Sequence, residues 1–199
     1  MEENQDKQKM QNYMTARMFA REYGTMLGGA WTIMFGGAMA SIRTGSGLGT
    51  ILMLVAALAC IVLPFYFASR YKNKPFNGES GISYFHALYF SFIMFFYASM
   101  ISAAVTFIYF QWMDDGAFID SIYAAIAEIE KGKDSLPPGM TEMLEKEKDM
   151  INQIAGIQIK PIEQALGMFN QGLISGLIVS VVTALFAKRE PDSTPPPIP

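Results

Sequence analysis

Residues 48–69 read "LGTILMLVAALACIVLPFYFAS" and contain no Asp, Glu, Lys or Arg. A helix of about 20 predominantly apolar residues is long enough to cross the hydrocarbon core of a bilayer. Three other segments share this lack of charge and are also long enough; they are residues 23–42, 83–112 and 167–187. The sequence therefore predicts an all-α integral membrane protein with four transmembrane helices.

The composition of the whole chain favours the same class. Of the 199 residues, 51% are hydrophobic and 17% are charged, whereas an average soluble domain carries about 25% charged residues. The net charge is −3, and no cluster of basic residues is interleaved with aromatic residues as in nucleic-acid-binding proteins. We therefore expect the lipid bilayer as the main partner and no nucleic acid.

The distribution of Lys and Arg predicts the orientation of the spans, because loops rich in these residues remain in the cytoplasm. Nine basic residues fall in the N-terminal tail, the loop between the second and third spans, and the C-terminal flank. The other side carries Arg43 and five lysines, and these lysines are diluted in a long acidic segment at residues 113–166. Both termini are therefore expected in the cytoplasm, with residues 113–166 outside it.

Two of the predicted spans carry small residues at every fourth position. They are Gly24, Gly28, Thr32, Gly36 and Ala40 in the first span, and Gly172, Gly176, Ser180 and Ala184 in the last. A four-residue step keeps such residues on one stripe of a helix, and small side chains let a neighbouring backbone approach closely. We expect the stripes to pack the first and last spans within one bundle, with a homodimer seam as the alternative.

The segment at residues 113–166 shows two amphipathic patterns. Apolar residues recur at spacings typical of one helix face; they are Ile119, Ile122, Ile126 and Ile129 in the first pattern, and Met143, Met150, Ile154 and Ile157 in the second. Because "LPPG" at residues 136–139 reads as a turn between them, we expect an extramembrane helical hairpin between the third and fourth spans. Helices lying on anionic lipid are disfavoured, since the polar faces are rich in Glu and Asp.

The tails complete the expected organisation. Residues 1–22 form an N-terminal tail in which Met10, Tyr13, Met14 and Met18 are spaced for an amphipathic helix. Residues 23–187 form the membrane domain. Residues 188–199 contain "EPDSTPPPIP" and lack apolar periodicity, so we expect a disordered, Pro-rich tail.

Few residues in the chain are candidates for chemistry. His86 is the single histidine, and Asp114 and Asp115 are adjacent carboxylates just beyond Trp112. An imidazole at the membrane interface and a solvated carboxylate pair are the expected roles; a proton or ligand contact at His86 and a metal at the two aspartates are the alternatives. One Cys and one His do not supply the usual ligand set of a zinc site, so we expect no catalytic residues, metal or cofactor.

The order of these features resembles a known family. Four spans are combined with the motifs "GISYFHA" at residues 81–87 and "FIYFQWMDD" at residues 107–115, and with a long polar segment before the last span. Over residues 24–187 this arrangement resembles the Bacteroidota membrane family catalogued as domain of unknown function 4199. The resemblance implies a four-helix fold in a bacterial inner membrane, which would place residues 113–166 in the periplasm. It implies no activity.

These observations favour a non-enzymatic protein with a structural, scaffold or accessory role. Ionisable residues inside a membrane usually mark ion or proton paths, and the predicted spans contain only His86 apart from Tyr and Cys. The outer hairpin is expected to meet a membrane-protein partner or another copy of the chain. The alternative is a transporter or channel component for an uncharged small solute.

Overall fold

The computed structural model describes residues 2–73, 82–131 and 160–188, and the side chains of residues 2–6, 8, 9, 125, 126 and 128–130 fall outside this description. Each of the five elements is an α-helix. In chain order they are α1 (Glu2–Thr44), α2 (Gly47–Lys72), α3 (Tyr84–Trp112), α4 (Ala117–Lys131) and α6 (Pro161–Ala187). The second helix expected in the outer hairpin, and the Pro-rich tail beyond residue 188, lie outside the described residues.

Four of the helices are long and apolar enough to cross a membrane, namely α1 from Met10 onward, α2, α3 and α6. The predicted all-α class with four helices of this kind is therefore confirmed, and the helices indicate a membrane protein. The expected amphipathic helix of the N-terminal tail is continuous with the first span, since α1 runs without a break for 43 residues. α6 begins at Pro161, where the fixed φ of proline suits the first helical position.

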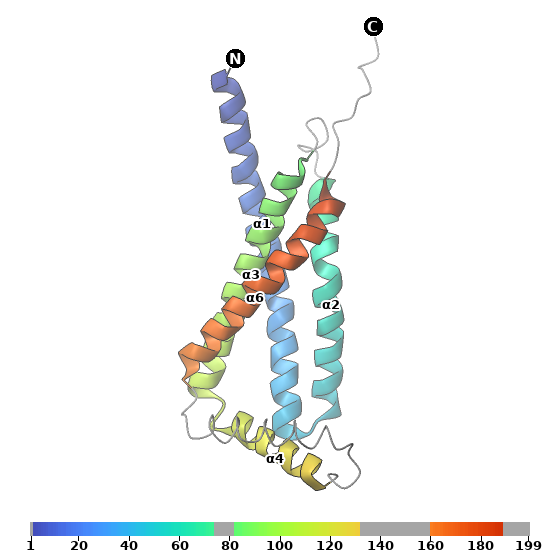
Figure 1. Cartoon of the computed structure of the whole chain (residues 1–199), viewed down its shortest axis with the longest axis vertical. Helices are drawn as coiled ribbons and strands as arrows, with labels where there is room; N and C mark the ends of the chain where they lie inside the picture. Colours follow the sequence, from blue (N-terminus) through green and yellow to red (C-terminus); the bar gives the residue numbers. More distant parts are fainter. Residues whose placement is uncertain (1, 74–81, 132–159, 189–199) are drawn as a thin grey trace.

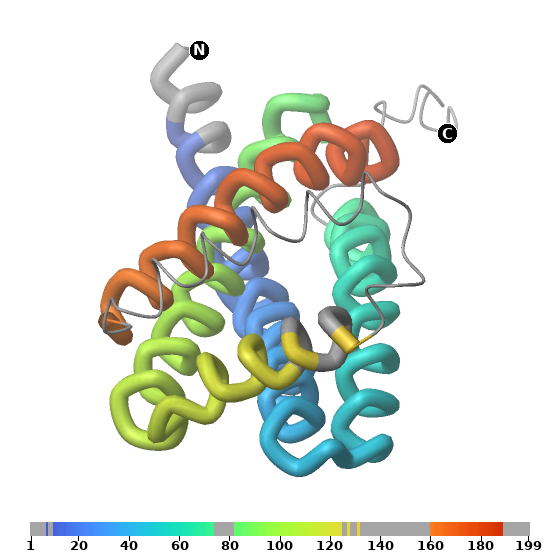
Figure 2. The backbone as a smooth tube through the Cα atoms, turned by 60° about the horizontal axis from the view of Figure 1, so that its bottom comes forward, coloured from blue at the N-terminus to red at the C-terminus, as the bar shows by residue number. Residues whose placement is uncertain are grey.

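The helices form a bundle with α1 and α3 at its centre (Figure 1). α2 packs against α1, and α6 crosses α3 obliquely. α1 and α3 run in the same direction, whereas α2 and α6 run in the opposite one. α4 lies across one end of the bundle, which we call the α4 end, and the N-terminal part of α1 projects from the other (Figures 1 and 2). We call this second end the tail end.

Local signals in the sequence set where the helices begin and end. Gly45, between α1 and α2, has a φ of 61°, which glycine adopts without steric cost. The N–H of Gly45 donates a hydrogen bond of 2.9 Å to the carbonyl of Ser41 and so completes the last turn of α1. At the start of α3, the hydroxyl of Ser83 accepts a 3.3 Å hydrogen bond from the backbone N–H of His86, as an N-cap does.

The core at the tail end is built from aromatic rings of three helices. The rings of Tyr71 and Phe90 stack with centroids 4.0 Å apart, and those of Tyr23 and Phe67 stack at 4.8 Å. All four side chains are buried. In contrast, α2 exposes a row of large aliphatic side chains, including Leu58 and Ile61, which is the surface expected to face lipid acyl chains.

Candidate functional site

The small-residue stripe of α6 packs along its whole length. Gly172, Gly176, Ser180 and Ala184 are all buried. A Cβ added to Gly176 would lie 2.6 Å from the Cβ of Phe95, and a Cβ added to Gly172 would meet the side chain of Ser99. Both contacts are with α3, so these glycines let α6 lie directly on α3.

The stripe of α1 packs over only part of its length. A Cβ added to Gly24 would lie 2.5 Å from the carbonyl oxygen of Met94, and one added to Gly28 would lie 2.9 Å from the Cβ of Ile101, so this part of α1 touches α3. Thr32 turns its hydroxyl back to the carbonyl of Gly28. Gly36 and Ala40 are exposed.

The glycines of both stripes therefore approach α3, and a Cβ added to Gly172 would also lie 3.0 Å from the ring of Trp31 in α1. On α3 the α1 stripe meets Ala98 at Gly28; Ala98, Ser102 and Thr106 are a further set of small residues and are all buried.

A third close approach, between α1 and α2, was not expected from the four-residue spacing. There a Cβ on Gly37 would lie 2.8 Å from the backbone nitrogen of Met53, and one on Gly49 would lie 2.7 Å from the backbone nitrogen of Ser41; Gly37 and Gly49 are the residues that allow this contact.

A groove opens where α1 and α3 separate near the α4 end. It has a volume of about 380 Å³ and includes Thr32, Gly36 and Ala40 of the α1 stripe. Val105 and Ile108 of α3 form part of its other wall. Arg43 and Met113 also line this groove.

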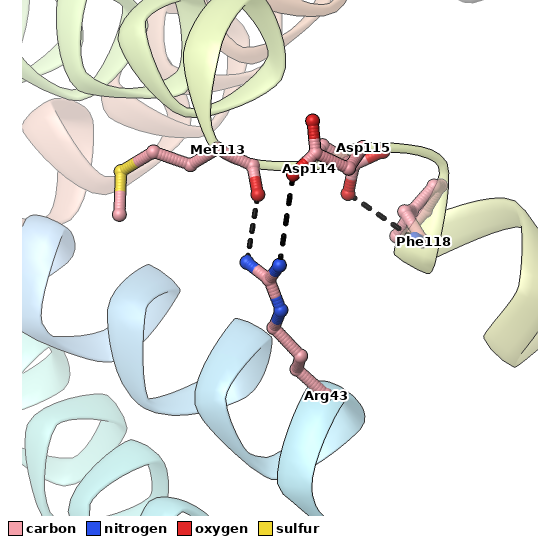
Figure 3. A network of polar contacts seen from close by, with 5 residues as sticks. All are labelled: Arg43, Met113, Asp114, Asp115 and Phe118. Atoms are coloured by element: carbon pink, nitrogen blue, oxygen red, sulfur yellow. Dashed lines mark hydrogen bonds and ion pairs between the residues drawn. The ribbon is translucent and has the colours of Figure 1, made fainter.

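Arg43 ties α1 to the connection between α3 and α4 (Figure 3). Its Nη1 donates a 2.7 Å hydrogen bond to the carbonyl of Met113, and its Nη2 lies 3.8 Å from a carboxylate oxygen of Asp115. Asp115 has a φ of 46° and is followed by Gly116 at 85°, so the backbone makes a tight left-handed turn here. This turn directs α4 across the end of the bundle.

The second carboxylate of the pair, that of Asp114, contacts α4. It is 5% exposed, and its Oδ1 accepts a 3.1 Å hydrogen bond from the N–H of Phe118 in the first turn of α4. The two aspartates, for which a shared metal was the alternative role, therefore make different contacts. Asp115 pairs with Arg43, and Asp114 accepts a hydrogen bond from α4. Across residues 2–73, 82–131 and 160–188, no three His, Cys, Asp or Glu side chains gather as a metal-binding group.

A crevice of about 380 Å³ lies between α1, α3, α4 and α6 at the α4 end. Aromatic and Met side chains form much of its wall, and Gln164 and Gln171 of α6 bring amide groups to it. Thr106 also lines the crevice; its hydroxyl is buried and has no hydrogen-bond partner among the described residues. The sequence did not single out this site, because its lining residues come from four helices.

His86 lies at the tail end, in the first turn of α3. Its Nε2 is 2.7 Å from the hydroxyl of the buried Tyr71, and which of the two atoms donates depends on the imidazole tautomer. The ring of Tyr13 from α1 lies against the imidazole with centroids 5.1 Å apart. His86 therefore joins three helices, an arrangement that accounts for a half-buried imidazole without a ligand.

Among the comparisons with known proteins, one gives a match, to a family model. The family model described as Protein of unknown function (DUF4199) matches residues 22–189, in agreement with the resemblance seen in the sequence. No curated protein and no solved structure matches the chain. The match covers most of the 199 residues. The chain therefore belongs to the DUF4199 family of proteins of unknown function.

Proposed function

We propose that this protein is a non-enzymatic accessory protein of a bacterial inner membrane, which presents α4 at the outer surface to a membrane-protein partner. The observation that carries the proposal is the attachment of α4 to the bundle. Arg43 holds the turn before α4 through Met113 and Asp115, and the ring of Phe118 packs edge-on against Phe110 at 5.6 Å. A helix held in this way is preorganised for docking, which lowers the entropic cost of binding.

The membrane part of the chain supports a role without ion transport or catalysis. Between Tyr23 and Ile42 of α1, and from Tyr84 to Trp112 in α3, no Asp, Glu, Lys or Arg occurs. The one imidazole, that of His86, is hydrogen-bonded to Tyr71. The distribution of Lys and Arg further supports an orientation with both termini in the cytoplasm and α4 in the periplasm.

The proposal is tested by purifying the tagged full-length chain from native membranes after crosslinking. Arg43→Gln removes the charge that holds the turn before α4, whereas Lys160→Gln removes an exposed cation at the same end whose partner is Glu163. We expect a partner, identified by mass spectrometry and by reciprocal purification, to be retained by the wild type and Lys160→Gln and reduced with Arg43→Gln. Faster hydrogen exchange of the Ala117–Lys131 amides in Arg43→Gln would show that α4 has been released. Equal recovery in all three proteins despite this release would contradict the proposal.

The crevice at the α4 end favours a second candidate function, in transport of an uncharged small solute. Its lining combines apolar walls with the Thr106 hydroxyl and two Gln amides and contains no charged side chain among the described residues. Gly167→Leu would fill this crevice, because a Cβ at Gly167 meets nothing within 4 Å. Uptake of a neutral solute such as glycerol into proteoliposomes, lost in Gly167→Leu and kept in the equally open Gly29→Leu, would favour transport over the accessory role.

A further inference from the structure

A second hollow lies toward the tail end, between α1 and α3. It has a volume of about 270 Å³ and is lined by Met14, Arg17, Met18, Arg21 and Tyr97. Arg17 and Arg21 are four residues apart on α1, and so are Met14 and Met18, so each pair lies on neighbouring turns of the helix. The hollow thus presents two guanidinium groups next to apolar side chains.

Arg17 and Arg21 differ from Arg43 and Arg70, whose guanidinium groups have partners within the chain. Arg43 is paired with Asp115, and Arg70 donates to the hydroxyl of Tyr66 at 2.9 Å. For Arg17 and Arg21, by contrast, no acidic side chain lies within ion-pair distance in the described part of the chain. Glu22 is next to Arg21 in sequence, but it does not line the hollow, and its charge lies within electrostatic range of Arg70.

The hollow lies where the charged part of α1 ends and its apolar part begins, which is the depth expected for lipid headgroups. Arg21 and Glu22 are the last charged residues of α1 before the apolar run that ends at Ile42. Tyr97 of α3 lies close to α1 at Gly24, because the glycine lets the two helices touch. A Cβ added to Gly24 would lie 2.8 Å from the Cβ of Tyr97. Side chains lean toward the N-terminus of a helix. Since α1 and α3 run in the same direction (Figure 1), Arg17, Arg21 and Tyr97 all lean toward the tail end.

We propose that this hollow binds the phosphate of an anionic phospholipid in the leaflet at the tail end. The Arg17 and Arg21 guanidinium groups would donate charge-assisted hydrogen bonds to the phosphate oxygens. The Tyr97 hydroxyl would add a neutral donor, and Met14 and Met18, both more than half exposed, would contact the glycerol and upper acyl carbons. Basic pockets between transmembrane helices on the cytoplasmic side bind anionic headgroups in this way. The site does not depend on the accessory role of α4.

The test is native mass spectrometry of the full-length chain in a neutral detergent, titrated with phosphatidylglycerol or phosphatidylcholine. We expect the wild type to retain phosphatidylglycerol in preference to phosphatidylcholine. The double variant Arg17→Gln/Arg21→Gln should weaken phosphatidylglycerol binding roughly tenfold or more, because each interfacial Arg contributes separately to the attraction. Arg70→Gln is the matched control, since it removes a cation on the same side that is already bonded to Tyr66, and it should retain the lipid nearly as the wild type does.

Two further measurements distinguish a lipid phosphate from free phosphate and keep the proposal testable if the double variant is unstable. Inorganic phosphate at millimolar concentration should displace little phosphatidylglycerol; complete displacement would overturn a lipid site in favour of a site for free anions. Tyr97→Phe keeps the ring and removes one donor, so it should weaken lipid binding by a smaller factor even if the double variant is unstable. Equal binding of both lipids by the wild type, or unchanged phosphatidylglycerol binding in a folded double variant, would overturn the proposal.

Discussion

The contact between His86 and Tyr71 links α3 to the end of α2, and it assigns the single histidine a structural partner within the chain. The sequence predicted an imidazole at the membrane interface, and the structure places His86 in the first turn of α3. The partner was not predictable, because Tyr71 and His86 are 15 positions apart and lie on different helices.

A substitution at His86 should therefore affect stability slightly. His86→Phe removes the hydrogen bond to Tyr71, and the net contribution of such a bond is about 0.5–1.5 kcal/mol. We expect a small decrease in the midpoint of thermal unfolding in detergent, and a smaller one for His86→Gln, whose amide can still bond the hydroxyl. Loss of a cellular phenotype with an unchanged unfolding midpoint would instead assign His86 a functional contact.

The two neighbouring aspartates should differ in their effect on α4. Asp114→Ala removes an acceptor from a first-turn N–H that has no partner inside the helix, at a cost of about 0.5–2 kcal/mol for a lost cap. Asp115→Ala removes an ion pair whose side chains are 47% and 83% exposed, and such pairs contribute about 0.2–1 kcal/mol. Hydrogen exchange of the α4 amides should therefore accelerate more in Asp114→Ala; the reverse order would contradict the assignment of Asp114 as the α4 cap.

At the scale of whole helices, close approach to α3 explains the glycines at 24 and 28 in the α1 stripe and at 172 and 176 in the α6 stripe. In α6 every member of the stripe is buried, whereas in α1 the last two members, Gly36 and Ala40, are exposed. Beyond Thr32 the larger side chain of Phe35 maintains the contact with α3, packing edge-on against Tyr109 at 5.4 Å. Packed helices cross at an angle and separate on either side of the contact. Spacing in the sequence identifies which residues share a stripe, but it does not contain the crossing angle, so the point where the α1 stripe becomes exposed was not predictable.

Leucine substitutions should lower the stability of the protein at packed glycines and be tolerated at open ones. Gly176→Leu and Gly28→Leu would force α6 or α1 away from α3, and overpacking of this kind typically costs about 1–3 kcal/mol or more. Gly36→Leu should be tolerated, since a Cβ at Gly36 meets nothing within 4 Å. Thermal unfolding and size-exclusion chromatography in detergent check both points. A change of oligomeric size caused by Gly36→Leu alone would support the homodimer seam for the exposed half of the α1 stripe.

At the scale of the whole molecule, the orientation of the bundle across the membrane can be tested by labelling its two ends. α4 lies at one end and the N-terminal part of α1 projects from the other (Figure 1). If the Lys and Arg distribution sets the orientation, a membrane-impermeant thiol reagent should label Ser121→Cys in α4 on spheroplasts. It should label Thr15→Cys in α1 only after permeabilisation. Both variants would carry Cys60→Ala, which removes the one native thiol. The opposite labelling pattern would reverse the orientation and place α4 in the cytoplasm.

The amino-acid sequence was sufficient to predict the all-α class, the family, and the four helices that are long and apolar enough to span a membrane in the described part of the chain. Transfer into lipid depends on the length and composition of a segment, and both can be read from the chain without its fold. Three features became visible in the folded protein alone: α3 lies between α1 and α6, Arg43 holds the turn before α4, and Arg17 and Arg21 share a hollow with Tyr97. Each of these depends on crossing angles and on contacts between residues far apart in the chain, because inside a membrane helices associate through close packing of specific surfaces and not through hydrophobicity alone.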